Sequence, residues 1–168
     1  MSTPESVNQK DGVGRDVYYL RARTLGSITG PEFPGRYFTL FIAADFSVFN
    51  VDELNNFAKK MLDAGVVYVC TWGNDCERMH DIFDEIIVER EKDKGYGSCI
   101  MTTWHSKDTV DEALWFALNS AFPDDEYTDA CRSILVLAVG DEAGEMVRTR
   151  LLDVQKFNRD ILNDSSNG

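Results

Sequence analysis

The sequence lacks an apolar run long enough to cross a membrane. No stretch approaches the roughly 18 consecutive apolar residues that a membrane-spanning helix requires. The first residues, MSTPESVNQKDGVGRD, are polar and contain no apolar core of the kind found in a secretory signal. We therefore expect a cytoplasmic protein that does not bind membranes.

Basic residues are also scarce. The chain has 17 Lys and Arg against 29 Asp and Glu, which gives a net charge of −12. Nucleic acids are polyanions that need a cationic binding surface. This charge therefore argues against nucleic acid and favours a cationic partner, either a protein or a small molecule.

The chain has few metal ligands and few nucleophiles. Its four cysteines are Cys70, Cys76, Cys99 and Cys131, and they are not spaced like a disulfide framework. Cys76 and His80 have the spacing of two ligands on one helix, but a structural zinc site needs four. Cys76 or Cys70 with His105 would suit a nucleophile pair, but a buried structural thiol is the commoner explanation of such cysteines. We expect no metal.

Several cofactor and catalytic motifs are missing. The sequence has no GxxxxGK[ST], HExxH or GxSxG motif. The segment nearest to GxGxxG is at Gly95–Gly97, which precedes a predicted strand, whereas the dinucleotide motif follows one. We therefore predict no cofactor.

Four strand-then-helix units can be read along the chain. Apolar runs at residues 37–44, 66–71, 98–103 and 133–139 predict buried strands, and an amphipathic helix pattern follows each one. Continuous apolar strands that alternate with helices are typical of a parallel sheet covered on both faces. The pattern predicts an α/β protein with a three-layer (αβα) Rossmann-like or flavodoxin-like fold and a mostly parallel sheet of about four strands, in the order 2-1-3-4.

The predicted domain organisation is simple. Residues 1–16 are polar and lack periodicity, so we expect a disordered N-terminal arm. One α/β domain would occupy residues 17–158, with the last helix running from about 142 to 158. Residues 124–129 should form an acidic loop, and residues 159–168 should be a frayed tail.

Polar and aromatic residues follow each predicted strand. In an open α/β sheet, ligands bind beyond the carboxyl ends of the strands, where the strand order reverses. Residues in the corresponding loops form the predicted ligand site: Asp45, Ser47, Trp72, Asp75, Trp104, His105 and Asp141. We expect the side chains of Asp45, Trp72, Asp75, Trp104 and His105 to converge on one hollow. His105 is the candidate acid–base catalyst.

Each of these residues also has a structural explanation. Asp75, Ser106 and Asp141 stand where helix N-caps are needed, and capping is the commoner reason for such residues. Trp72 and Trp104 either cover the end of the sheet or offer a stacking platform for a ring or a cation.

Two functions from different classes remain open. The first is small-molecule binding, or weak catalysis, at the crevice formed by the carboxyl ends of the strands. The second is a non-catalytic acidic module, such as an inhibitor or immunity-type protein, that binds a basic partner through residues such as Asp124, Asp125, Glu126 and Asp129. A deep pocket enclosed by both Trp72 and Trp104 and by His105 would favour the first function, and a flat sheet end with an acidic face elsewhere would favour the second.

Overall fold

The architecture centres on one twisted sheet. A computed structural model describes residues 3–92 and 99–167. Within them, six strands pair in the order β1-β2-β6-β3-β4-β5. The strands are β1 (Glu5–Lys10), β2 (Asp16–Ala22), β3 (Tyr37–Ala43), β4 (Val66–Trp72), β5 (Met101–Trp104) and β6 (Cys131–Val139). β1 runs antiparallel to β2, and the other neighbours pair in parallel.

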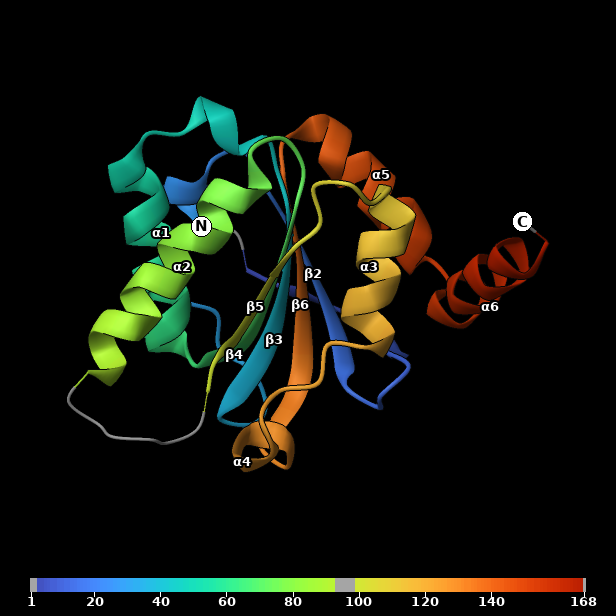
Figure 1. Cartoon of the computed structure of the whole chain (residues 1–168). Helices are drawn as coiled ribbons and strands as arrows, with labels where there is room; N and C mark the ends of the chain where they lie inside the picture. The colour runs from blue at the N-terminus through green and yellow to red at the C-terminus, as the bar shows by residue number, and fades with distance from the viewer. Residues whose placement is uncertain (1–2, 93–98, 168) are drawn as a thin grey trace.

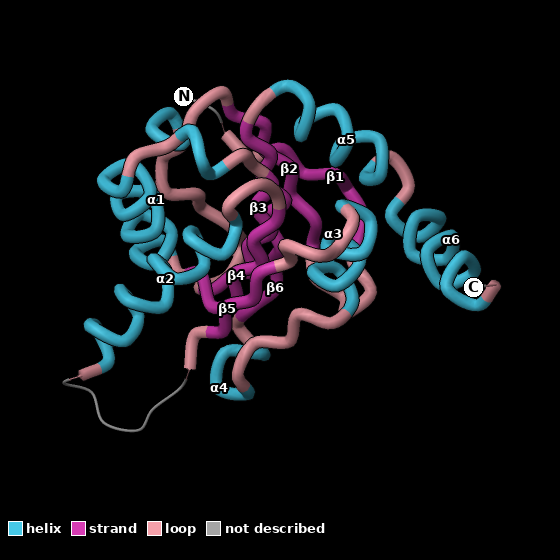
Figure 2. The backbone as a smooth tube through the Cα atoms, turned by 45° about the horizontal axis from the view of Figure 1, so that its top comes forward, coloured by secondary structure: helices cyan, strands magenta, loops and turns pink. Residues whose placement is uncertain are grey.

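Helices cover both faces of this sheet. They are α1 (Val51–Ala64), α2 (Cys76–Glu91), α3 (Val110–Asn119), α4 (Asp125–Thr128), α5 (Asp141–Leu151) and α6 (Val154–Ser166), with short 3-10 turns η1 (Leu25–Ser27) and η2 (Phe46–Val48). Figure 1 shows α1 and α2 on one side of the sheet and α3 and α5 on the other. Figure 2 shows that α6 extends outward from α5 and carries the C-terminus.

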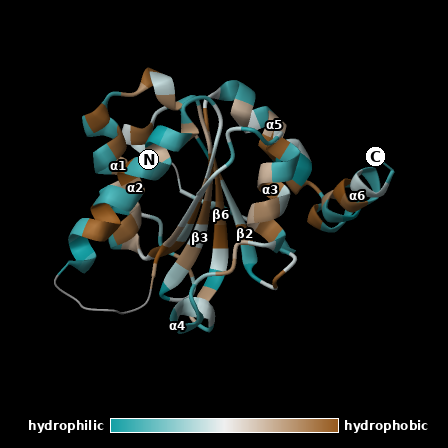
Figure 3. Cartoon of the chain, viewed as in Figure 1, coloured by the Kyte–Doolittle hydropathy of each residue, from teal (hydrophilic) through white to brown (hydrophobic). Residues whose placement is uncertain are grey.

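The strands of the sheet are largely apolar, as the hydropathy colouring of Figure 3 shows. The reason is that helices cover both faces of the sheet. One core lies between the sheet and α1 and α2 and includes Leu40, Leu135 and Phe83. The second lies between the sheet and α3, α5 and α6 and includes Phe41 and Val136. Alternate residues of β3 and β6 point into opposite cores, so neither strand has a polar face. Among the described residues, no helix is both long and apolar enough to cross a membrane.

Local sequence signals define two of the helix starts. Asn50 caps α1 and Thr109 caps α3, each in a complete capping box with the glutamate three residues later. Gly65 ends α1 in the left-handed conformation, with φ +100°. A Cβ atom at this position would lie 2.4 Å from the carbonyl oxygen of Arg36. Glycine is therefore required where α1 turns into β4.

The predicted α/β fold with a mostly parallel sheet is confirmed, but the strand number and order were wrong. The sheet has six strands among the described residues, and the four predicted ones occur in the order 4-1-2-3. After β5, α3 crosses to the opposite face, and the chain returns to place β6 beside β3. The third predicted strand starts at Met101, and Ser98 lies outside the described residues.

The N-terminal segment also differs from the expected arm. Residues 5–10 form β1, and β2 follows it from Asp16 to Ala22. The reason is a set of long-range polar contacts. The side chain of Gln9 donates to the carbonyl oxygen of Leu151 at 3.0 Å and accepts from the backbone N–H of Val154 at 2.7 Å. Residues 1–2 lie outside the described residues.

The C-terminal helix is divided in two. α5 ends at Leu151, and α6 begins after Asp153, whose carboxylate accepts from the backbone N–H of Lys156 at 2.9 Å. This N-cap starts a second helix that runs to Ser166, so residues 159–166 do not form the expected frayed tail. The expected acidic loop contains the short helix α4, which Asp124 caps.

Candidate functional site

A hollow of about 320 Å³ lies at the carboxyl ends of β3, β4 and β6. This is where the strand order reverses, because β4 and β5 follow on one side of β3 and β6 lies on the other. Its lining comes from the loops after these strands and from the first turns of α5: Ala44, Asp45, Trp72, Gly73, Asn74, Val139, Gly140, Asp141, Glu142, Ala143 and Met146. The lining therefore contains Asp45, Trp72 and Asp141 from the predicted site.

Asp45 is held in place by the residues around it. Its Oδ1 atom accepts from the backbone N–H and the hydroxyl of Ser47, at 3.0 and 2.5 Å, and from Nδ2 of Asn74 at 3.1 Å. The hydrogen bonds from Ser47, and then the one from Asn74, lower the pKa of this exposed carboxyl group. Asp45 is therefore an oriented carboxylate at neutral pH.

Gly73 lets the loop after β4 lie directly against the end of β3. Its φ is +117°, and a Cβ atom there would lie 2.0 Å from the carbonyl oxygen of Ala44. Two backbone hydrogen bonds join the loops: Ala44 N–H donates to the Trp72 carbonyl at 3.1 Å, and Phe46 N–H donates to the Asn74 carbonyl at 2.9 Å. This close approach places Trp72 and Asn74 beside Asp45.

Trp72 forms a half-buried aromatic wall. Its indole Nε1 donates to the carbonyl oxygen of Asp108 at 3.0 Å. The Asp108 carboxylate in turn lies 2.7 Å from Nδ1 of His105. The loop between β5 and α3 thus fixes the orientation of the indole. Of the two alternatives for Trp72, covering the sheet end and lining a site, the position of this indole fits both.

His105 lies outside the lining of the hollow. It is 7% exposed, its Nε2 atom lies 3.1 Å from the hydroxyl of Thr103, and its ring packs against Phe116 at 4.9 Å between centroids. Both ring nitrogens therefore have protein partners. The arrangement supports a structural role for His105 in the loop after β5.

Trp104 points to the opposite face of the sheet from His105. Its ring packs against His80 of α2 at 4.5 Å between centroids, and the residue is 46% exposed. Successive side chains of a strand point to opposite faces, and β5 is the outermost strand, beyond β4. The predicted convergence of five side chains on one hollow was therefore wrong. The prediction assumed that the third predicted strand lies beside the first, whereas β5 lies beyond β4.

Asp75 and Asp141 have different environments, and neither forms the side-chain cap that its position suggests. Asp75 has a left-handed conformation, with φ +59°, and its carboxylate lies 3.5 Å from Arg78. Asp141 starts α5 and lies 2.5 Å from a guanidinium nitrogen of Arg21. This hydrogen bond lowers the pKa of Asp141, as does the positive charge of Arg21. Ser106 does not cap α3 either, because Thr109 does.

The lining of the hollow also contains residues that were not among the predicted site residues. Asn74 and Glu142 lie in the same loops as the predicted Trp72, Asp75 and Asp141. Met146 follows Glu142 by four residues, so both lie on one face of α5. That spacing is the signal that could have found Met146.

The cysteines do not form a reactive site. Cys70, Cys76 and Cys131 are buried, and Cys99 is exposed. Burial raises the pKa of Cys70 to about 12 and also raises the pKa of Cys76, so both thiols are less ionised than a free cysteine. Within residues 3–92 and 99–167, no group of three or more His, Cys, Asp or Glu residues is arranged to hold a metal ion.

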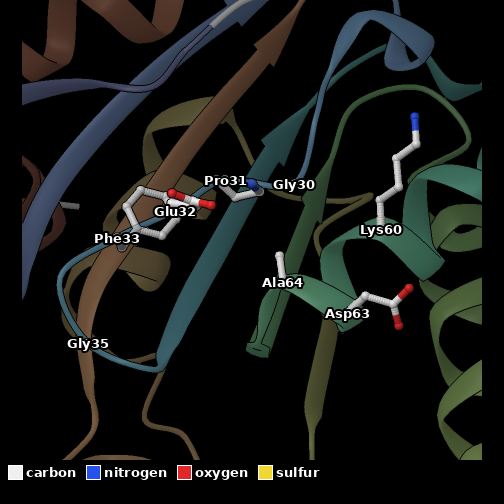
Figure 4. A pocket seen from close by; sticks show the side chains of 8 residues that line it. All are labelled: Gly30, Pro31, Glu32, Phe33, Gly35, Lys60, Asp63 and Ala64. Atoms are coloured by element: carbon white, nitrogen blue, oxygen red, sulfur yellow. The ribbon is translucent and has the colours of Figure 1, made fainter.

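A larger hollow lies away from the strand ends. It measures about 630 Å³ and runs between the loop before β3 and the last turns of α1. Figure 4 shows Glu32 and Phe33 on the loop side and Lys60, Asp63 and Ala64 on the helix side. Asp63 is paired with Arg90 at 2.9 Å. The lining of this groove combines Glu32 and Asp63 with Lys60, and it lies away from the point where the strand order reverses.

Comparison with known proteins gives one match. A family model described as a domain of unknown function (DUF7684) matches residues 17–154. The matched segment begins in β2 and ends at the first residue of α6, so it includes every residue that lines the hollow at the strand ends. No curated protein and no solved structure matches the chain.

Proposed function

The chain belongs to the family described as a domain of unknown function (DUF7684), and we propose that it binds a small molecule in the hollow at the carboxyl ends of β3, β4 and β6. The ligand is a cationic or neutral ring compound. Trp72 provides the stacking surface, and carboxylates at the rim receive the polar groups of the ligand.

The charge of the lining is the observation that carries this proposal. Three carboxylates border the hollow, from Asp45, Asp141 and Glu142, and its lining includes no lysine or arginine. Arg21 neutralises part of the charge of Asp141. The remaining negative charge favours cations and disfavours phosphates, and an indole beside carboxylates suits a cation that stacks on its face.

The topology supports the same location. The strand order β5-β4-β3-β6 reverses between β3 and β6, and open α/β sheets bind ligands beyond the carboxyl ends of the strands at such a reversal. The loop after β3 contains Asp45 and η2 in place of the glycine-rich turn that binds a pyrophosphate. The proposed ligand is therefore different from a dinucleotide.

The proposal concerns binding and assigns no catalytic step. His105, the acid–base candidate, is buried outside the lining and has partners for both ring nitrogens. Asp45 and Asp141 have lowered pKa values, which suits anionic binding groups better than proton donors.

A thermal-shift screen tests the proposal. The panel would contain cationic, neutral and phosphorylated ring compounds, and we expect only the first two classes to raise the melting temperature. Asp45→Asn keeps the shape of the side chain and removes its charge, so it should weaken binding of cations. Trp72→Ala should remove the response to all ring ligands.

Trp104→Ala is the matched control, because Trp104 is also the last residue of a parallel strand but its ring packs against His80 of α2, on the opposite face of the sheet from Trp72. A ligand whose effect survives Asp45→Asn and Trp72→Ala but disappears with Trp104→Ala would show that the site lies elsewhere. Binding of phosphorylated compounds alone would also contradict the proposal.

A further inference from the structure

β5 lies at one edge of the sheet that the described strands form. It pairs with β4, and no other described strand pairs with it. In a parallel ladder, alternate residues direct their backbone groups to the same neighbour. The N–H of His105 donates to the carbonyl of Thr71 on β4. By alternation, Thr102 and Trp104 direct their backbone N–H and C=O groups away from β4, where an added strand could pair with them.

Large apolar side chains are exposed along this edge. Met101 is 39% exposed and Trp104 is 46% exposed. One face of Trp104 is supported by His80, whose own ring nitrogens lie 3.1 Å from Asp81 and 3.4 Å from Asp84. The indole is therefore held in place while part of its surface remains accessible, as an aromatic contact residue requires.

Several carboxylates lie beside β5 on the α2 side of the sheet. Asp81 and Asp84 have side chains that are 63% and 47% exposed, and Asp84 accepts a hydrogen bond from the hydroxyl of Thr102 on β5. Glu91 lies on the same face of α2, because residues at spacings of three, four and seven share a helix face. Asp124 lies near the start of β5, where its carboxylate accepts from the backbone N–H of Cys99 at 3.4 Å.

The basic residues of α2 are directed elsewhere. Arg78 lies near Asp75 and donates to the carbonyl of Phe46 in η2 at 3.4 Å. Arg90 pairs with Asp63 of α1. Burial, and then the negative charges of Glu91, Asp124 and Asp84, raise the pKa of Cys99 at the start of this edge.

We propose that this acidic edge, formed by β5 with Asp81, Asp84, Glu91 and Asp124, binds an extended basic segment of a partner protein by strand addition. The segment pairs its main chain with Thr102 and Trp104. Its alternate side chains lie on the α2 side, where lysine or arginine contacts the indole of Trp104 and the carboxylates. A second copy of this chain does not fit, because two identical acidic edges would repel each other.

This surface is separate from the hollow at the strand ends, so the inference goes beyond the proposed function. Charge complementarity would speed encounter and select basic partners, and the main-chain hydrogen bonds would require an extended conformation. The two requirements can be tested independently.

Defined peptides provide the test. A peptide of alternating lysine and valine should bind, as measured by calorimetry, and should shift the backbone amide resonances of Thr102 and Trp104. A peptide of alternating glutamate and valine should not bind. A lysine–valine peptide interrupted by proline should bind weakly, because proline removes a main-chain donor. Binding should weaken as salt is raised.

Variants locate the surface. Trp104→Ala should weaken binding about fivefold, by loss of the cation–π contact, and Asp81→Asn should weaken it by a similar factor while retaining the shape of the side chain. Glu126→Gln on α4 is the matched control and should have no effect. The proposal would be overturned if the glutamate–valine peptide or the proline-containing peptide bound as tightly as the lysine–valine peptide. It would also be overturned if Glu126→Gln weakened binding as much as Asp81→Asn does. Self-association through β5, detected by sedimentation, would overturn it as well.

Discussion

His105 and Trp72 are connected through Asp108, although Trp72 ends β4 and His105 follows β5. The carboxylate of Asp108 lies 2.7 Å from Nδ1 of His105, and its carbonyl oxygen accepts from the indole of Trp72 at 3.0 Å. A residue predicted to be catalytic therefore supports the wall of the proposed site from outside.

This connection predicts an effect of His105→Ala on Trp72. Loss of the imidazole should free the Asp108 loop, so the indole proton of Trp72 should exchange faster with solvent than in the wild type. Hydrogen exchange measured by NMR on the indole resonance tests this, and the indole of Trp104 serves as an internal reference. An unchanged rate for Trp72 would show that the loop holds it without His105.

A buried ion pair anchors the N-terminal segment. Nε of Arg15 lies 2.6 Å from Oδ2 of Asp11, with side chains 5% and 0% exposed. Arg15 also donates to the hydroxyl of Thr39 and to the carbonyls of Ala117 and Ala121 at the end of α3. The cation therefore neutralises the negative end of that helix as well as the carboxylate.

Asp11→Asn should reduce the free energy of unfolding by about 3 kcal/mol, because it leaves a buried guanidinium without its counterion. Asp16→Asn is the matched control. It removes an exposed pair with Lys10, whose side chains are 58% and 41% exposed, and should cost less than about 1 kcal/mol. Denaturant unfolding measures both. Equal losses in the two variants would mean that the Asp11 pair contributes no more than a surface pair.

The exposed thiol should report on the acidic edge. Cys99 is the exposed cysteine, whereas the other three are buried, so a thiol reagent should modify Cys99 first in the native protein. Burial and then the charges of Glu91, Asp124 and Asp84 raise the pKa of Cys99. Less thiolate is then present at neutral pH, and labelling should be slower than for a free cysteine.

The labelling rate should rise with pH and, at fixed neutral pH, with salt. Salt screens the carboxylates, lowers the pKa of Cys99 towards its ordinary value and so increases the thiolate fraction. Glu91→Gln should have the same effect at low salt. A labelling rate that falls as salt is added would contradict the proposed field at this edge.

Sequence periodicity predicted local elements well and long-range placement poorly. The runs that became β3, β4 and β6 are apolar because both sheet faces are covered, and Asn50 and Thr109 mark helix starts through contacts within three residues. The strand order depends on which face of the sheet each connecting helix covers. An amphipathic helix has the same sequence pattern on either face, so the sequence does not distinguish the two. Trp72 and Trp104 therefore appeared equivalent, although β5 lies at the edge of the sheet.

Polar contacts between distant residues were likewise invisible in the sequence. Gln9 bonds to residues at the junction of α5 and α6, and Arg15 bonds to the end of α3. Both lie in a segment whose composition is typical of a disordered arm. Hydrogen bonds between a polar residue and a distant part of the chain leave no periodic pattern in the sequence. The structure of the N-terminal segment could therefore not be predicted from the pattern of its own residues.

Crystallographic soaking of small cationic and neutral ring compounds into the unliganded protein tests the proposed site directly. We expect density for a ring stacked on Trp72, with a polar group within hydrogen-bond distance of Asp45 or Glu142. Crystals of Trp72→Ala, soaked in the same way, should show no such density. Compounds that bind only in the groove between Phe33 and Ala64, or that bind beside Trp72 equally well in the Trp72→Ala crystals, would contradict the proposed site.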